Sequence, residues 1–96
     1  MSAGTILDQI IDAILALLGG RKSLEELSVA LDKKAAEGSE RLDWRHSIVD
    51  LMKLVGMDSG LPAREKMARE LGYTGELNGS AEMNNWLHAR VMEKLR

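Results

Sequence analysis

Residues 42–56 constrain the fold more than any other part of the chain. At about 100° per residue, their large apolar side chains share one wide helical face. These side chains are Trp44, Ile48, Val49, Leu51, Met52, Leu54 and Val55. Asp43 is a favourable N-cap, and Gly56 can take the left-handed turn that ends a helix. Because a face this wide needs more than one neighbour, the sequence predicts a central helix over residues 44–55.

Two helices are predicted before the central one. Thr5 can cap a helix over residues 6–18 that Gly19 and Gly20 end. Ser23, with Glu26 three residues later, has the pattern of a capping box and predicts a second helix from Leu24. That helix should break at residues 37–39.

Two more helices are predicted after the central one. Ser59 and Pro62 are start signals for the fourth helix, and Gly72 can close it. Ser80 can cap a fifth helix. Apolar residues recur at every fourth position of the fifth helix, namely Met83, Leu87, Val91 and Leu95.

No segment alternates apolar and polar residues convincingly, so we expect no strand. The sequence therefore predicts one all-α domain over residues 1–96, a compact bundle of five short helices around a central helix. Its parts would be an amphipathic N-terminal helix (6–18) and a four-helix core (24–95).

Composition narrows the function classes. The chain has no cysteine, which excludes disulfides, thiolate metal sites and cysteine nucleophiles. Its formal charge of −2 gives no overall attraction to nucleic acids or anionic lipids. Residues 6–18 are too short to span a bilayer, and no basic residue precedes Arg21 as a signal peptide would require. We therefore expect a cytoplasmic protein without a membrane span.

The residue types of a metal or catalytic site occur together at His46, Ser47 and Asp50. Zinc needs three or four ligands, however, and the only other histidine, His88, lies on a different predicted helix. Successive residues of one helix point about 100° apart, which places Ser47 and His46 poorly for a nucleophile–base contact. We expect no metal, no cofactor and no enzymatic activity.

Aromatic and polar residues near the fifth helix allow two interpretations. Tyr73, Asn84, Trp86 and His88 could form a polar recognition patch at the edge of this helix. Alternatively, Asn84 and His88 could be partly buried and tie the helix to a loop carbonyl. Trp44 and Trp86 are expected mainly as core anchors.

Several segments together resemble one known family. They are residues 42–52, Ala63-Arg64, residues 70–75, Met83-Asn84, residues 86–88 and Val91-Met92. In this order they are similar to the mainly bacterial domain of unknown function numbered 3597, over roughly Leu24 to Leu95. The resemblance implies a small five-helix domain and no established activity. Family members typically carry a long loop between the first two helices, whereas only residues 19–22 separate them here.

These observations favour a non-enzymatic interaction module whose partner is a protein or a second copy of the chain. The apolar arc of the first helix is wider than one neighbour needs, which predicts self-association through Ile6, Ile10, Ile14 and Leu17. The alternative is a peptidoglycan-binding module, because residues 69–75 and Asn78-Gly79 are reminiscent of small helical domains of that kind. DNA binding through residues 62–71 is disfavoured because that segment carries both signs of charge.

Overall fold

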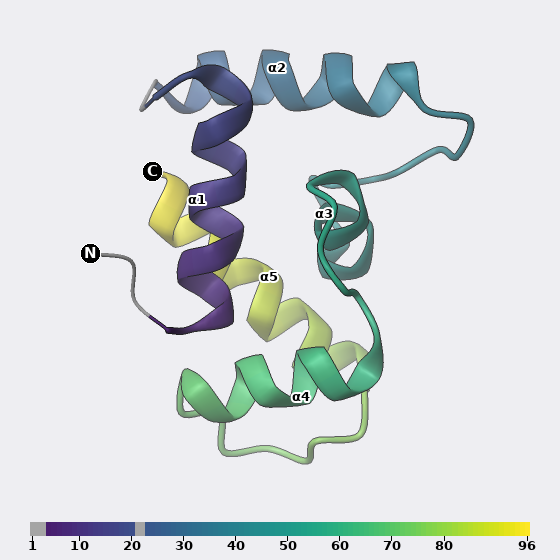
Figure 1. Cartoon of the computed structure of the whole chain (residues 1–96). Helices are drawn as coiled ribbons and strands as arrows, with labels where there is room; N and C mark the ends of the chain where they lie inside the picture. Colours follow the sequence, from purple (N-terminus) through teal and green to yellow (C-terminus); the bar gives the residue numbers. More distant parts are fainter. Residues whose placement is uncertain (1–3, 21–22) are drawn as a thin grey trace.

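The computed structural model describes residues 4–20 and 23–96, and within them it contains five α-helices and no strand. In chain order these are α1 (Ile6–Leu18), α2 (Leu24–Glu37), α3 (Ile48–Leu54), α4 (Leu61–Glu70) and α5 (Ala81–Leu95), as Figure 1 shows. The predicted all-α bundle of five short helices is confirmed.

Local capping determines where most of these helices begin. The Thr5 side chain accepts a hydrogen bond from the amide of Asp8, and the Ser80 side chain accepts one from the amide of Met83. Ser23 and Glu26 form the predicted capping box. Pro62 lies in the first turn of α4, where its missing amide costs nothing, although the N-cap itself is Gly60.

The third helix begins later than predicted. Its cap is Ser47, whose side chain accepts a hydrogen bond from the amide of Asp50, and Asp43 caps no helix. Residues 44–46 instead form a turn closed by hydrogen bonds from the amides of His46 and Ser47 to the Asp43 carbonyl. The helix ends as predicted, because Gly56 follows it with a left-handed φ of 79°.

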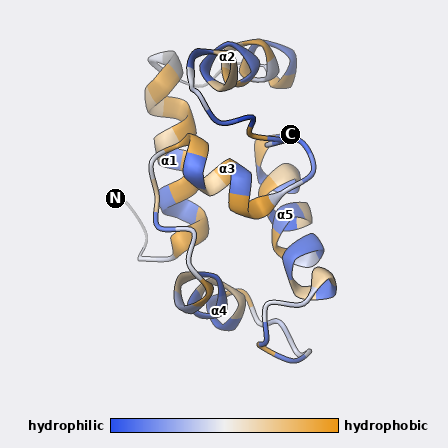
Figure 2. Cartoon of the chain, turned by 90° about the vertical axis from the view of Figure 1, so that its right-hand side faces the viewer, coloured by the Kyte–Doolittle hydropathy of each residue, from blue (hydrophilic) through white to orange (hydrophobic). Residues whose placement is uncertain are grey.

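The helices cross rather than run parallel. In Figure 1, α2 lies across one end of α1 and α4 lies across the other. The main packing partners of α5 are α1, α3 and α4, whereas those of α3 are α2 and α5. Figure 2 shows α3 between α1 and α5 in that view. The central position predicted for α3 is therefore shared with α1 and α5, which each pack against three other helices.

The core is built mainly from aliphatic side chains of α1, α3 and α5. The shares of α1 and α5 are Ile6, Ile10, Ile11 and Ile14, and Met83, Leu87, Val91 and Leu95, respectively. The predicted ladder on α5 is thus confirmed as its buried face. Among the helices of the described residues, none has the length and apolar composition that a membrane crossing requires.

Candidate functional site

The turn that contains Trp44 is held from two sides. Trp44 is 2% exposed, and its indole N–H donates a hydrogen bond of 2.9 Å to Asp32 Oδ1 on α2. The backbone carbonyl of Trp44 lies 2.8 Å from Nε2 of His88, which is itself buried on α5. Because a carbonyl oxygen only accepts, Nε2 carries the proton in this contact. Trp44 is therefore the core anchor that the sequence predicted, and His88 ties α5 to a loop carbonyl.

Asp32 also binds the next residue of this turn. Its Oδ2 accepts a hydrogen bond of 2.7 Å from Nη2 of Arg45, whose guanidinium lies 4.6 Å from the centre of the Trp44 ring. The hydrogen bond from Arg45, and secondarily the one from Trp44, lowers the pKa of the Asp32 carboxyl. No sequence pattern indicated this role, because Asp32 and Trp44 lie on different elements and are brought together only by folding.

The residue types that a metal or catalytic site would need, His46, Ser47 and Asp50, have other partners in the structure. His46 Nδ1 lies 3.1 Å from Asp43 Oδ1, while Asp50 accepts a hydrogen bond from the amide of Asp43. The Ser47 hydroxyl is occupied as the cap of α3. Within residues 4–20 and 23–96, no three His, Asp or Glu side chains gather as potential metal ligands.

The four residues of the predicted polar patch do not form one surface. Tyr73 and Trp86 meet with ring centroids 5.0 Å apart, and Arg90 lies over the Trp86 ring at 5.2 Å. Asn84 points elsewhere, because it is two positions and therefore about 200° from Trp86 around the helix. Its amide nitrogen donates to the Gly79 carbonyl, and its oxygen accepts from Arg64 on α4. The hydrogen bonds of Asn84 and His88 therefore join α5 to other parts of the chain. Of the four residues of the predicted patch, Tyr73 and Trp86 lie side by side.

Within this pair, the Tyr73 ring is partly buried and lies close to the backbone of Gly75. Partial burial, with smaller contributions from Glu82 and Glu76, raises the pKa of the Tyr73 phenol. Neither the Tyr73 hydroxyl nor Arg90 Nε has a hydrogen-bond partner among the described residues. Gly75 makes room for the ring, because a Cβ there would lie 2.6 Å from Tyr73 Cζ.

The predicted self-association face on α1 is mostly interior. Ile10 and Ile14 are 0% exposed and Ile6 is 9% exposed, whereas Leu17 is 45% exposed. The wide apolar arc of α1 is covered by α2, α4 and α5, three neighbours in the same chain. The interpretation of Ile6, Ile10 and Ile14 as a free surface is therefore wrong. Of the four residues predicted for self-association, Leu17 is the exposed one.

A second exposed apolar side chain lies on α2. Val29 is 65% exposed, although the neighbouring positions of the outer face are charged. Leu17 borders a shallow hollow of about 390 Å³ together with Ala30, Lys33, Lys34 and Glu37 of α2. We call the hollow-lining residues Leu17, Ala30, Lys33 and Lys34, together with the exposed Val29 that precedes Ala30 on α2 but does not itself line the hollow, the α1–α2 patch. Val29 could have been found in the sequence as an aliphatic residue on a helix face otherwise occupied by Glu25, Glu26 and Lys33.

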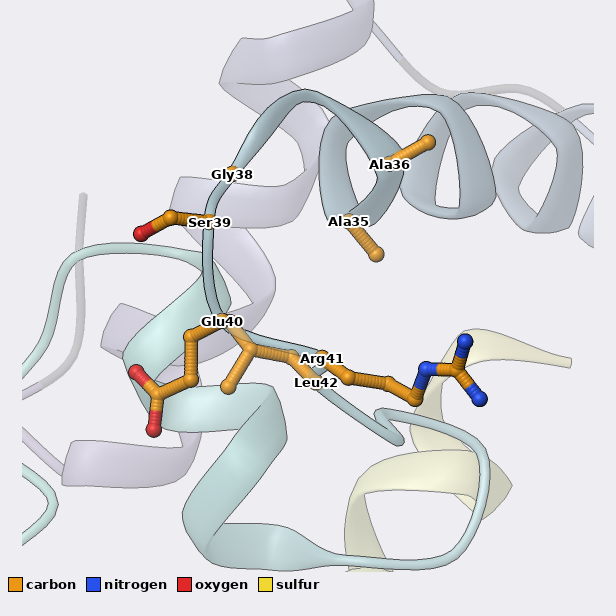
Figure 3. Close-up of a pocket in the computed structure, with 7 residues that line it drawn as sticks. All are labelled: Ala35, Ala36, Gly38, Ser39, Glu40, Arg41 and Leu42. Atoms are coloured by element: carbon orange, nitrogen blue, oxygen red, sulfur yellow. The ribbon is translucent and has the colours of Figure 1, made fainter.

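Another hollow lies under the end of α2, where the chain turns towards α3 (Figure 3). It measures about 380 Å³ and is lined by Ala35, Ala36 and residues 38–42. In Figure 3 the Ser39 and Glu40 side chains point to one side and Arg41 points to the other. Glu40 is also paired with Lys53 at 3.1 Å. The polar groups do not converge as they do in a small-molecule site.

Comparison with known proteins agrees with the fold and adds no activity. The sequence model of the family described as "Domain of unknown function (DUF3597)" matches residues 16–96. No curated protein matches the chain. The solution structure of a conserved unknown protein, RPA2825 from Rhodopseudomonas palustris, is 54% identical, with a TM-score of 0.60. The match covers 72% of this chain and 53% of RPA2825, so the chain spans about half the length of that protein.

Proposed function

The chain belongs to the DUF3597 family, a domain of unknown function, and we propose that it is a non-enzymatic module that binds another protein through the α1–α2 patch. The observation that supports this proposal is the exposure of two large aliphatic side chains, Leu17 at 45% and Val29 at 65%. A contiguous apolar surface rimmed by polar residues is typical of a protein contact site.

The charges around these side chains indicate what the partner presents. Lys33 and Lys34 border the same hollow as Leu17 and Ala30, and Glu37 adds one carboxylate among the described residues that line it. Because unlike charges steer encounter and fix orientation, the partner should present an apolar segment flanked by carboxylates. The proposal places this contact in the cytoplasm, as expected from the sequence, and fractionation of the native host would check that compartment.

The test compares two exposed apolar sites of one chain. The Leu17→Ser, Val29→Ser double variant removes the exposed apolar side chains of the patch, whereas Leu61→Ser removes another exposed large apolar side chain, which is 36% exposed on α4. With each chain immobilised and the native-host extract applied, we expect a protein retained by the parent and by Leu61→Ser but lost with the double variant. Equal retention by all three chains would refute the proposal, provided that their thermal melts agree.

Charge reversal gives an independent check. Lys33→Glu with Lys34→Glu leaves the apolar side chains in place and should release the same protein, mainly by slowing association. Binding that is indifferent to this change would contradict the acidic partner.

The glycan alternative has less support from the site. Peptidoglycan binding would use an aromatic face, and the Trp86 ring already has Arg90 over it and Tyr73 beside it. Pelleting of the intact chain with purified peptidoglycan, compared with Trp86→Ala, would test that function directly.

A further inference from the structure

Asn78 lies in the loop between α4 and α5 (Figure 1) and is followed by a residue without a side chain. It is exposed, and it precedes Gly79 and then Ser80, the cap of α5. No Cβ at Gly79 shields the amide nitrogen of that residue from the Asn78 carboxamide. Because both groups belong to one short stretch of chain, they meet at a high effective concentration. Their reaction would need no second protein.

Two hydrogen bonds orient the carboxamide of Asn78. The backbone N–H of Ser80 donates to Oδ1 at 3.0 Å, and Nδ2 donates to Glu76 Oε2 at 3.2 Å. When an amide nitrogen attacks Cγ, negative charge develops on Oδ1, which is the atom that the Ser80 N–H already contacts. The loop therefore polarises this carbonyl towards attack.

The other two asparagines of the chain, Asn84 and Asn85, lie within α5. In a helix, the amide that follows each of them points along the axis to a carbonyl of the preceding turn and not towards the side chain. Asn84 is held further, because its oxygen accepts from Arg64 at 2.8 Å and its nitrogen donates to the Gly79 carbonyl. The fold thus protects these two and leaves Asn78 open.

From these contacts we propose that Asn78 is a site of spontaneous covalent modification, at which the Gly79 amide nitrogen displaces ammonia from Asn78 Cγ. The bond between that nitrogen and Cγ forms and the Cγ–Nδ2 bond breaks. The amide proton passes through solvent to the leaving nitrogen, which departs as ammonia. Water then opens the cyclic imide at either carbonyl, giving aspartate or isoaspartate. The proposal concerns the loop before α5 and is independent of the proposed function.

The two products differ in what happens to the contacts of this loop. Aspartate keeps an acceptor for the Ser80 N–H, and its negative charge near the start of α5 is favourable. Isoaspartate routes the main chain through Cβ and Cγ, which lengthens it by one carbon before Gly79. Gly79 is closely packed, because a Cβ there would lie 2.8 Å from Leu61 Cδ1, and its carbonyl accepts from Asn84. Isoaspartate should therefore loosen the junction of α4 with α5.

Ageing of the intact folded chain in mildly alkaline buffer tests the site. Trypsin cleaves after Arg69 and Arg90, so one peptide contains all three asparagines. Fragmentation mass spectrometry of this peptide, compared with a sample digested before ageing, locates each exchange of NH₂ for OH. We expect conversion of Asn78 to exceed that of Asn84 or Asn85 at least about tenfold, because the helical asparagines react only when α5 opens. Equal conversion of the three would overturn the proposal.

Two variants at the same position serve as controls. The hydroxyl of Asn78→Ser can still accept from the Ser80 N–H but forms no imide, so this variant should accumulate far less acidic form on ion exchange than the parent. Asn78→Asp reproduces the product with the native main chain. The acidic form isolated from aged parent should melt about 4–8 °C below Asn78→Asp, as expected for the loss of one hydrogen-bonded contact in a domain of this size. Equal acidic forms in parent and Asn78→Ser would overturn the modification site, and equal melting of aged parent and Asn78→Asp would overturn the isoaspartate product.

Discussion

At the scale of single residues, the Trp44 turn concentrates the polar ties of the core. The indole N–H, the backbone carbonyl and the neighbouring guanidinium of Arg45 each bind another part of the chain. The indole N–H and the carbonyl lie inside the structure, where an unpaired donor or acceptor would lose its hydration without compensation, whereas the Arg45–Asp32 contact is exposed. These hydrogen bonds therefore hold the turn in one conformation, although it is neither a helix nor a strand.

Two Trp44 variants should separate its packing from its hydrogen bond. Trp44→Ala empties a site that is 2% exposed, and we expect a loss of about 3–5 kcal/mol in the free energy of unfolding. Trp44→Phe keeps a ring but removes the donor to Asp32, so the loss should be smaller. Urea denaturation measures both, and equal losses would contradict the core role of the ring.

Asp32 should make the stability pH-dependent. Its pKa is lowered in the folded state, chiefly by Arg45, so the folded protein binds this proton less readily than the unfolded chain. The contribution is complete above the unfolded pKa of about 3.9 and is lost as pH falls through the lower folded pKa. In Asp32→Asn, the free energy of unfolding measured by urea denaturation should fall less steeply as the pH is lowered through this range. If the fall is the same as in the parent, Asp32 is not its cause.

At the scale of elements, helix ends were predictable where one residue decides them. Thr5, Ser23 and Ser80 cap their helices as predicted, because capping needs only the local chain. The start of α3 was not predictable from these rules. Asp43 and Ser47 are both good caps, and Trp44 stands four positions before Ile48, so the turn imitates another helical turn in the pattern of apolar residues.

The two caps can be compared by mutation. Ser47→Ala removes the acceptor for the Asp50 amide and should cost about 1 kcal/mol of stability. Asp43→Ala removes only an exposed contact with His46 and should cost less. Thermal or chemical denaturation of both variants gives the order. The reverse order would mean that the helix begins at residue 44.

At the scale of the whole molecule, the sequence identified the apolar faces but not what covers them. The arc on α1 was correctly seen as too wide for one neighbour, yet the number of neighbours depends on how the helices cross. The prediction of the polar patch was incorrect for a related reason. Tyr73 precedes the loop that leads to α5, and only the folding of that loop brings its ring against Trp86. By contrast, the opposite directions of Asn84 and Trp86 could have been read from their spacing of two residues.

The matched family segment and the core do not coincide, and this difference leads to the last prediction. Residues 6–15 of α1 precede the segment matched to the family, yet they supply four buried isoleucines. Ile14→Ala, at a site that is 0% exposed, should therefore cost about 2–5 kcal/mol of stability. Leu17→Ala, one turn later and 45% exposed, should change it by about 0.5 kcal/mol or less. Because both substitutions shorten an aliphatic side chain of the same helix, urea denaturation of the pair isolates burial as the cause. Equal, small effects would mean that α1 is an appendage and that the core is complete without it.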